Sequence, residues 1–131
     1  MLGDIIELSI VVKDLEAAIK DFETLLDLKV YDRRESKEFG FKNAILPLGK
    51  GHIELLQPTD SSSAMARFLE TRGEGVYLVG FDVEDIPASI KRLRERGARV
   101  TEGGPDYPIA WVHPRDAHGV FVELRKPEQY D

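Results

Sequence analysis

The sequence contains no cysteine and a single tryptophan among its 131 residues. The missing cysteines exclude a disulfide framework, a thiolate metal site and a thiol nucleophile. Apolar runs are far shorter than the roughly 20 residues that cross a bilayer. The N-terminus, MLGDII, lacks a basic region followed by an apolar core. We therefore expect no transmembrane helix and no signal peptide, and we expect a cytoplasmic protein without a membrane partner.

Positive charge is also in short supply, since 18 Lys and Arg residues face 24 Asp and Glu residues and give a formal net charge of −6. A chain without a basic face cannot displace the counterions of nucleic-acid phosphates, so we expect no nucleic-acid partner. The hydrophobic share of 42% and the charged share of 32% are typical of a soluble globular protein. The length suits one domain.

The sequence repeats itself. VKDLEAAIKDF at 12–22 aligns with VEDIPASIKRL at 83–93, an offset of 71 residues with five identities. IELLQP at 53–58 aligns with VELRKP at 122–127, an offset of 69 residues. Two matches in the same order and at nearly the same offset indicate an internal duplication.

Each copy has the same predicted layout, which is a strand, a helix and three further strands. Asp14 and Asp85 stand where helix N-caps belong. The last three strands are expected near 29–36, 40–48 and 51–57 in the first copy, and near 98–102, 107–113 and 119–126 in the second. We predict a single α+β domain over 1–131, in which two paired βαβββ modules form an incomplete barrel around a cavity. The modules span about 4–57 and 75–126, with a linking helix at about 60–73.

The alternation of side chains along a strand predicts which residues face the cavity. In IIELSIVVKDLE, Leu8, Ile10 and Val12 belong beneath the helix, so the intervening Glu7 and Ser9 face the cavity. The two repeat offsets relate position 7 to position 78, and position 54 to position 123. Pseudo-twofold symmetry should bring these four positions toward one point. They hold Glu7, Glu54, Leu78 and Glu123, and the same faces carry His52, Phe121 and Arg125.

The motifs VVKDLEAAIKDFETLLDLKV, HIELLQP, RFLETRGEGVYLVGFDVEDI and HPRDAHGVFVEL together resemble the vicinal oxygen chelate superfamily over nearly the whole chain. Within it, the methylmalonyl-CoA epimerases are the nearest likeness, and glyoxalase I and the bleomycin-resistance proteins are more distant. The resemblance implies a homodimer. It also implies a divalent metal ion held by one residue from each of four strands, commonly two His and two Glu or Gln.

The resemblance places the metal ligands at Glu7, Glu54 and Glu123, while the fourth position falls on Leu78, which cannot coordinate an ion. The epimerases typically carry His where this chain has Glu7. Three carboxylates suit Mg²⁺, Mn²⁺ or Ca²⁺, the family also admits Co²⁺, and a site without metal is the alternative. Without an ion, two unit charges about 4 Å apart repel by roughly 4 kcal/mol at an effective dielectric of about 20. A proton, Arg125 or His52 would then have to balance them.

The leading function is a small-molecule enzyme that performs isomerase, epimerase or lyase chemistry through a stabilised enolate. Glu123 and Glu54 would act at the reacting oxygen. Glu38 aligns with a glutamate that the epimerases are thought to use as a base. Substrate-binding side chains would come from His52, Leu78, Phe121 and Arg125.

Two other functions stay open, namely a binding protein that sequesters a small molecule in the same cavity, and a metal-free enzyme with a protonated glutamate as general acid. Several candidates also have purely structural interpretations. Glu7 reads equally as an edge-strand charge, and Glu38 reads as a solvated hairpin charge. The aromatic residues Phe41, Tyr107 and Trp111 read as packing residues.

Overall fold

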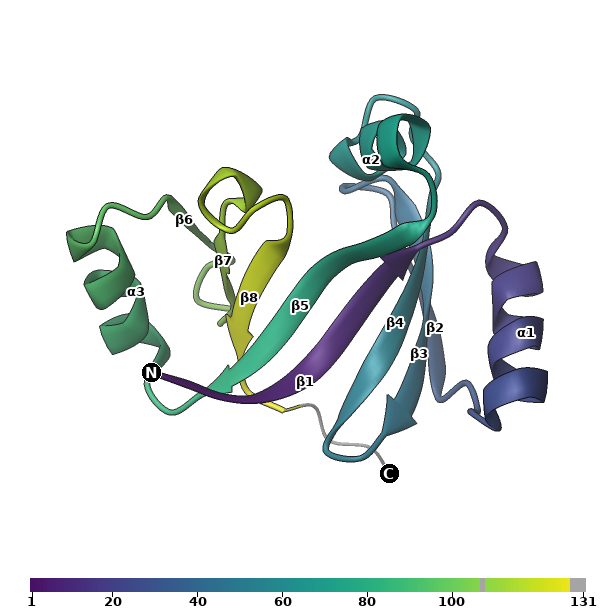
Figure 1. The fold of residues 1–131 in the computed structure, drawn as a ribbon, viewed down its shortest axis with the longest axis horizontal. Coiled ribbons are helices and arrows are strands. Elements are labelled where there is room, and N and C mark those ends of the chain that lie inside the picture. The colour runs from purple at the N-terminus through teal and green to yellow at the C-terminus, as the bar shows by residue number, and fades with distance from the viewer. Residues whose placement is uncertain (107, 128–131) are drawn as a thin grey trace. The chain divides into compact units, whose positions relative to one another are not determined.

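The computed structural model describes residues 1–106 and 108–127 (Figure 1). Tyr107, and with it the first position of the strand predicted at 107–113, lies outside the described residues. The elements follow the predicted order of a strand, a helix and three strands, written twice around a linking helix. They are β1 (Leu2–Val11), α1 (Leu15–Leu26), β2 (Asp32–Ser36), β3 (Phe41–Leu48), β4 (Gly51–Pro58), α2 (Ala64–Arg72), β5 (Gly75–Val83), α3 (Ile86–Glu95), β6 (Val100–Glu102), β7 (Ala110–Val112), a 3₁₀ turn (Pro114–Asp116) and β8 (Phe121–Arg125).

The described residues divide into two compact units, one of residues 8–77 and one of residues 1–7 with 78–127. The boundary falls within β1 and within β5, so each of these strands contributes to both units. In hydrogen-bonded order the strands run β2-β3-β4-β1-β5-β8-β7-β6. Because β2 and β6 are edge strands, the sheet is open, and the fold is of the mixed α+β class that the sequence predicts.

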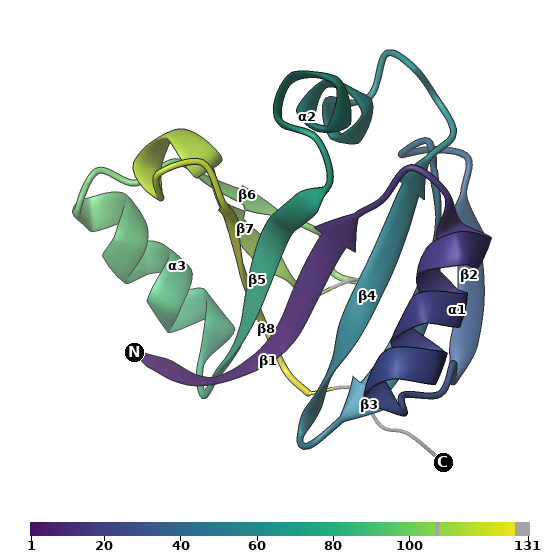
Figure 2. The ribbon, with the colours of Figure 1, turned by 45° about the vertical axis from the view of Figure 1, so that its right-hand side comes forward.

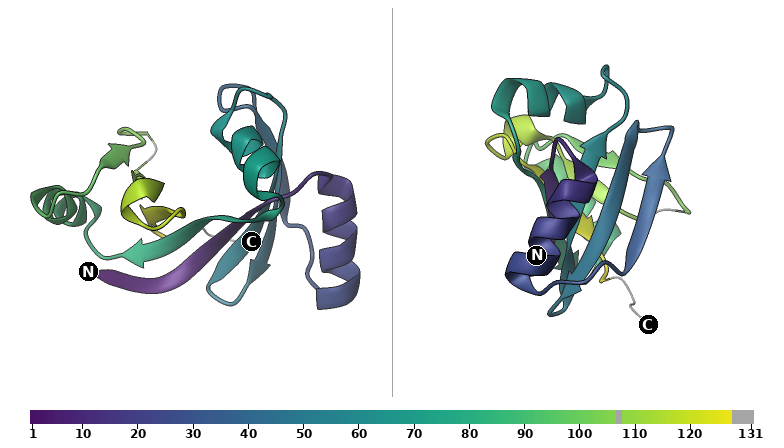
Figure 3. Two further views of the ribbon diagram at one scale, coloured as in Figure 1. Left: turned by 45° about the horizontal axis from the view of Figure 1, so that its top comes forward. Right: turned by 90° about the vertical axis from the view of Figure 1, so that its right-hand side faces the viewer.

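In the unit of residues 8–77, α1 covers one face of the β2, β3 and β4 strands (Figures 1 and 2). The right-hand view of Figure 3 shows this helix lying across the strands. Val12 packs there with Ile10 at its side, which agrees with two of the three residues predicted to lie beneath the helix. The buried core consists of Val12, Leu15, Ile19, Ala44, Leu46 and Leu55.

The predicted caps fix the ends of the helices. The Asp14 side chain accepts a hydrogen bond from the Ala17 amide at 3.1 Å and starts α1. In the same way Ser63 starts α2 by accepting from the Ala66 amide at 3.1 Å, so this helix is shorter than the predicted 60–73. Gly73 ends α2 as predicted, and it has a positive φ of 84°.

In the unit of residues 1–7 and 78–127, β5 is parallel to β8, β8 is antiparallel to β7, and β7 is antiparallel to β6. Helix α3 is capped by Asp85 as predicted and lies beside these strands (Figures 1 and 2). Val122 and Leu124 pack toward α3, so the alternate residues of β8 lie on the other face. The core consists of Val83, Ile90, Ala110 and Leu124.

No helix in residues 1–106 and 108–127 is long and apolar enough to cross a membrane.

Candidate active site

A buried group of charges lies on the face of β8 opposite α3. Arg125 Nη1 donates to Glu7 Oε1 at 2.7 Å and to Glu123 Oε2 at 3.3 Å. The side chains of Glu7, Glu123 and Arg125 are only 4%, 5% and 13% exposed. Glu7 comes from β1 and the other two from β8, so the neighbouring strand order of β1, β5 and β8 brings them together. We call these three residues the Arg125 cluster.

Two strand neighbours complete the surroundings of Glu123. Trp111 is its register partner on β7 and donates from Nε1 to Glu123 Oε1 at 2.8 Å. Gly80 is its register partner on β5. A Cβ at position 80 would lie 2.8 Å from Glu7 Cβ and 3.3 Å from Glu123 Oε2, so only glycine leaves room for both carboxylates. The structure therefore makes Trp111 a hydrogen-bond donor to the cluster and not only a packing residue.

The cluster changes the acidity of Glu123. Burial and then the charge of Glu7 raise the pKa of the Glu123 carboxyl well above its usual value. Arg125 and the Trp111 N–H oppose the rise in pKa, since both favour the ionised form, whereas a hydrogen bond to Glu7 favours the protonated form. Glu123 is thus a carboxyl group that holds its proton more tightly than an exposed glutamate does.

Glu54 belongs to the other unit and has other partners. Ile53 and Leu55 pack toward α1, so Glu54 lies on the opposite face of β4. Its Oε1 accepts from Ser9 Oγ at 2.7 Å, and its Oε2 accepts from Asn43 Nδ2. His52 lies two residues before it and is 4% exposed. Both oxygens of Glu54 therefore have hydrogen-bond donors.

The remaining predicted site residues are distributed as follows. Leu78 is half-buried and pairs in register with Phe121, whose ring lies 6.4 Å from that of His113. Gly80, not Leu78, is the residue beside Glu123. Glu38 is exposed in the turn between β2 and β3. The convergence of positions 7, 54, 78 and 123 on one point stays a prediction.

Sequence reasoning missed three of these contacts. The sequence predicts Trp111 as a packing residue, and it predicts no role for Asn43 or Gly80. A signal for Gly80 exists in hindsight, because an isolated glycine within a strand often marks a close approach of neighbouring chains. For Asn43 and Trp111 the register with β4 and β8 is needed.

The model of the glyoxalase/bleomycin resistance protein/dioxygenase superfamily matches residues 7–111. The chain belongs to this superfamily. The match begins at Glu7 and includes the first helix, the linking helix and Gly80. The resemblance seen in the sequence motifs is thereby confirmed.

Several similar proteins are methylmalonyl-CoA epimerases. The chain is 34% identical over 133 residues to the ethylmalonyl-CoA/methylmalonyl-CoA epimerase of Cereibacter sphaeroides, covering 96% of this chain and 99% of the relative. The crystal structure of methylmalonyl-CoA epimerase from Mycobacterium tuberculosis has a TM-score of 0.85 and 31% identity, with 98% and 90% of the two chains covered. A methylmalonyl-CoA epimerase in complex with methylmalonyl-CoA and NH₄⁺ has a TM-score of 0.87 and 27% identity, with 100% and 99% covered.

The superfamily resemblance implies a metal, and the residues of the Arg125 cluster do not fit one. Within residues 1–106 and 108–127, no group of three or more His, Cys, Asp or Glu side chains is arranged to hold a metal ion. Glu7 and Glu123 already face a guanidinium nitrogen, and Trp111 donates to the second oxygen of Glu123. Leu78 offers no ligand atom at all.

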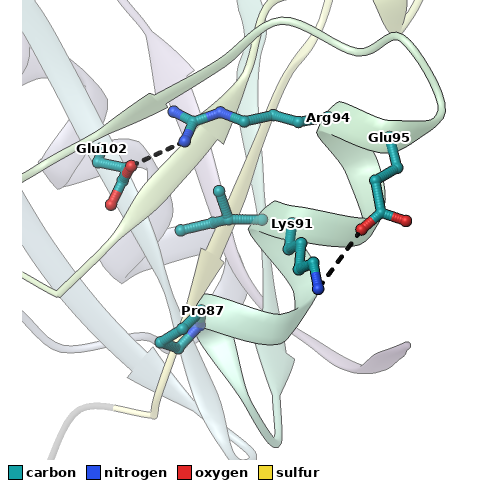
Figure 4. Close-up of a pocket in the computed structure, with 6 residues that line it drawn as sticks. Pro87, Lys91, Arg94, Glu95 and Glu102 are labelled. Carbon is teal, nitrogen blue, oxygen red and sulfur yellow. Dashed lines mark hydrogen bonds and ion pairs between the residues drawn. The ribbon is translucent and has the colours of Figure 1, made fainter.

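A pocket of about 550 Å³ is lined by one side of α3 and by Glu102 of β6 (Figure 4). Lys91 and Arg94 are each paired with a carboxylate there, at 3.9 Å to Glu95 and 3.0 Å to Glu102. The pocket is thus charge-balanced, and none of its lining residues belongs to the Arg125 cluster. Those residues are Pro87, Ile90, Lys91, Arg94, Glu95 and Glu102.

Proposed function

We propose that this chain is an epimerase that inverts the α-carbon of a 2-substituted malonyl-CoA thioester. The observation that supports this most directly is the similarity to two such epimerases over at least 96% of this chain, at 34% and 31% identity. The buried, proton-holding Glu123 supplies the kind of acid–base group that this chemistry needs. Epimerisation is one of the isomerase, epimerase and lyase reactions that the sequence predicts.

The reaction is a proton transfer with no net change in composition. The α-hydrogen lies between a carboxylate and a thioester carbonyl, so a base removes it as a proton and the electron pair moves onto the thioester oxygen. An acid then returns a proton to the opposite face of the same carbon, and the electron pair returns to form the C–H bond. Groups that stabilise the negative oxygen lower the barrier to both steps.

We assign Glu123 the role of an acid, because its pKa is raised well above the ordinary value. Burial raises its pKa, and the Trp111 N–H fixes the carboxyl orientation at 2.8 Å. Enzymes commonly separate acid and base roles by giving two carboxyl groups different surroundings. Glu54, whose oxygens accept from Ser9 and Asn43, stays a candidate catalytic carboxylate, as predicted from the sequence. The exposed Glu38 is a second candidate base, as predicted from the sequence.

Hydrogen exchange at the α-carbon tests the proposal. In D₂O, wild-type protein should incorporate deuterium at the α-carbon of methylmalonyl-CoA. Proton NMR follows this as the loss of the α-hydrogen signal. Glu123→Gln keeps the shape of the side chain but removes the acid, so the exchange rate should fall by about 10²–10⁴-fold. Glu102→Gln is the matched control, because Glu102 forms only an exposed ion pair with Arg94. It should exchange at the wild-type rate.

Binding of methylmalonyl-CoA without exchange would contradict the proposal and favour the sequestering protein that the sequence left open. Isothermal titration calorimetry with the same thioester separates these two outcomes. Equal exchange by wild type and Glu123→Gln would remove Glu123 from the reaction, and Glu54→Gln and Glu38→Gln would then identify the group responsible.

We also propose that the protein is a cytoplasmic homodimer. The superfamily resemblance supports the homodimer, and the cysteine-free composition is compatible with a cytoplasmic location. Light scattering coupled to gel filtration should give twice the chain mass of 14.8 kDa. A monomer at micromolar concentration would contradict the dimer.

A further inference from the structure

We propose that the guanidinium of Arg125 is the resident cation of this centre and stands in place of a divalent metal ion between Glu7 and Glu123. Arg125 is thus a positioning residue that keeps the two carboxylates together. The inference does not depend on the proposed epimerase reaction, because it concerns only which cation the two carboxylates hold.

The contacts of Arg125 fix its guanidinium at two ends. Nη1 faces both carboxylates, at 2.7 Å from Glu7 and 3.3 Å from Glu123. At the other end, Nε donates to the Lys126 carbonyl at 3.1 Å. A planar guanidinium held at separate nitrogens has a defined orientation, which a point-like ammonium or a mobile counterion would not have.

Burial makes this cation necessary. Glu7 and Glu123 are 4% and 5% exposed, so water contributes little to separating their charges. When Glu123 gives up its proton, the two carboxylates repel one another, because little water screens them. A cation that contacts both offsets this repulsion, and breaking such a buried arrangement by removing one partner is strongly destabilising.

The same contacts oppose a metal ion at this place. An ion bound by Glu7 and Glu123 would have to displace the guanidinium, or lie beside it and be repelled by its positive charge. Trp111 donates to Glu123 Oε1, so that oxygen is also engaged. Gly80 brings β5 so close that no side chain from position 80 can supply a further ligand.

Metal content and thermal stability test the inference on wild-type protein. Protein purified without chelator should contain far less than one divalent ion per chain by elemental analysis. Millimolar Co²⁺ or Mn²⁺ should leave its Tm unchanged, since a ligand that binds only the folded state raises Tm. One tightly bound ion per chain, or a rise in Tm with either ion, would overturn the inference.

Substitution of Arg125 gives the second readout. Arg125→Met keeps an unbranched apolar stem but removes the charge, so its Tm should fall by about 10 °C or more. Adding Glu7→Gln should restore part of that loss, because it removes a buried charge that Arg125 no longer compensates. Arg94→Met is the matched control, since it removes an arginine from the exposed pair with Glu102. Its Tm should change by less than about 2 °C.

Two outcomes would overturn the inference here as well. One is an Arg125→Met protein as stable as Arg94→Met, and the other is a double variant that loses stability additively. If Arg125→Met does not fold, Arg125→Lys is the variant to measure, because it retains the charge without the planar fork. It should fold, with a Tm below that of wild type. Failure of the deuterium-exchange assay would leave these measurements unaffected, because none of them uses a substrate.

Discussion

Replacing Gly80 by alanine should destabilise the protein, because the added methyl group would collide with the side chains of Glu7 and Glu123. The added Cβ would lie 2.8 Å from Glu7 Cβ, 3.3 Å from Glu123 Oε2 and 3.6 Å from Arg125 Cδ. Ordinary van der Waals contact between carbon atoms begins near 3.4 Å. The Glu123 carboxyl can rotate, but Glu7 Cβ is attached to the backbone of β1, so relief requires β1 and β5 to separate locally.

The expected size of the effect follows from two contributions. Inserting one methyl group into a tightly packed site costs about 1–3 kcal/mol of unfolding free energy. A shift of Glu7 also lengthens its 2.7 Å ion pair with Arg125, which weakens the pair further. Alanine at a compatible glycine position instead stabilises by about 0.4–1 kcal/mol, because it restricts the unfolded chain.

Gly75 supplies the matched control on the same strand. A Cβ at Gly75 would meet no atom within 4 Å. Urea unfolding followed by circular dichroism should place Gly80→Ala about 2–4 kcal/mol below Gly75→Ala in unfolding free energy. Equal unfolding free energies for the two variants would refute the reasoning, since they would show that β1 and β5 accommodate the methyl group without strain.

Two further predictions concern Glu123. Its folded-state pKa is raised above the ordinary value of 4.5, so the folded protein binds more protons than the unfolded chain and its stability falls as the pH rises through the range between the two pKa values. Glu123→Gln cannot titrate, so its unfolding free energy relative to wild type should increase from pH 4.5 toward neutrality in urea titrations. A pH-independent difference would contradict this. Trp111→Phe removes the 2.8 Å donor to Glu123 and should cost about 1–3 kcal/mol in the same assay. It should also steepen the fall of stability with pH, because the lost hydrogen bond lowered the Glu123 pKa; an unchanged slope would argue against that contact.

The sequence by itself determined the order of the elements and the faces of the strands. Caps at Asp14 and Asp85 act on the next three residues, so local chemistry is enough to place the starts of α1 and α3. The period of two along a strand separates Ile53 and Leu55 from Glu54 without knowledge of any neighbour. The duplication and the superfamily motifs are likewise visible in the chain alone.

Tertiary structure decided which polar side chains meet. Trp111 reaches Glu123 only because β7 pairs with β8 in one register, and a shift of one residue would turn the indole to the other face. The spacing of residues in the sequence also does not decide whether a metal ion, a proton or Arg125 neutralises the charge of Glu7 and Glu123. That outcome depends on the strand order β1-β5-β8 and on a glycine between the two acids. Contacts between strands distant in the sequence are set by packing and register, and no local pattern encodes them.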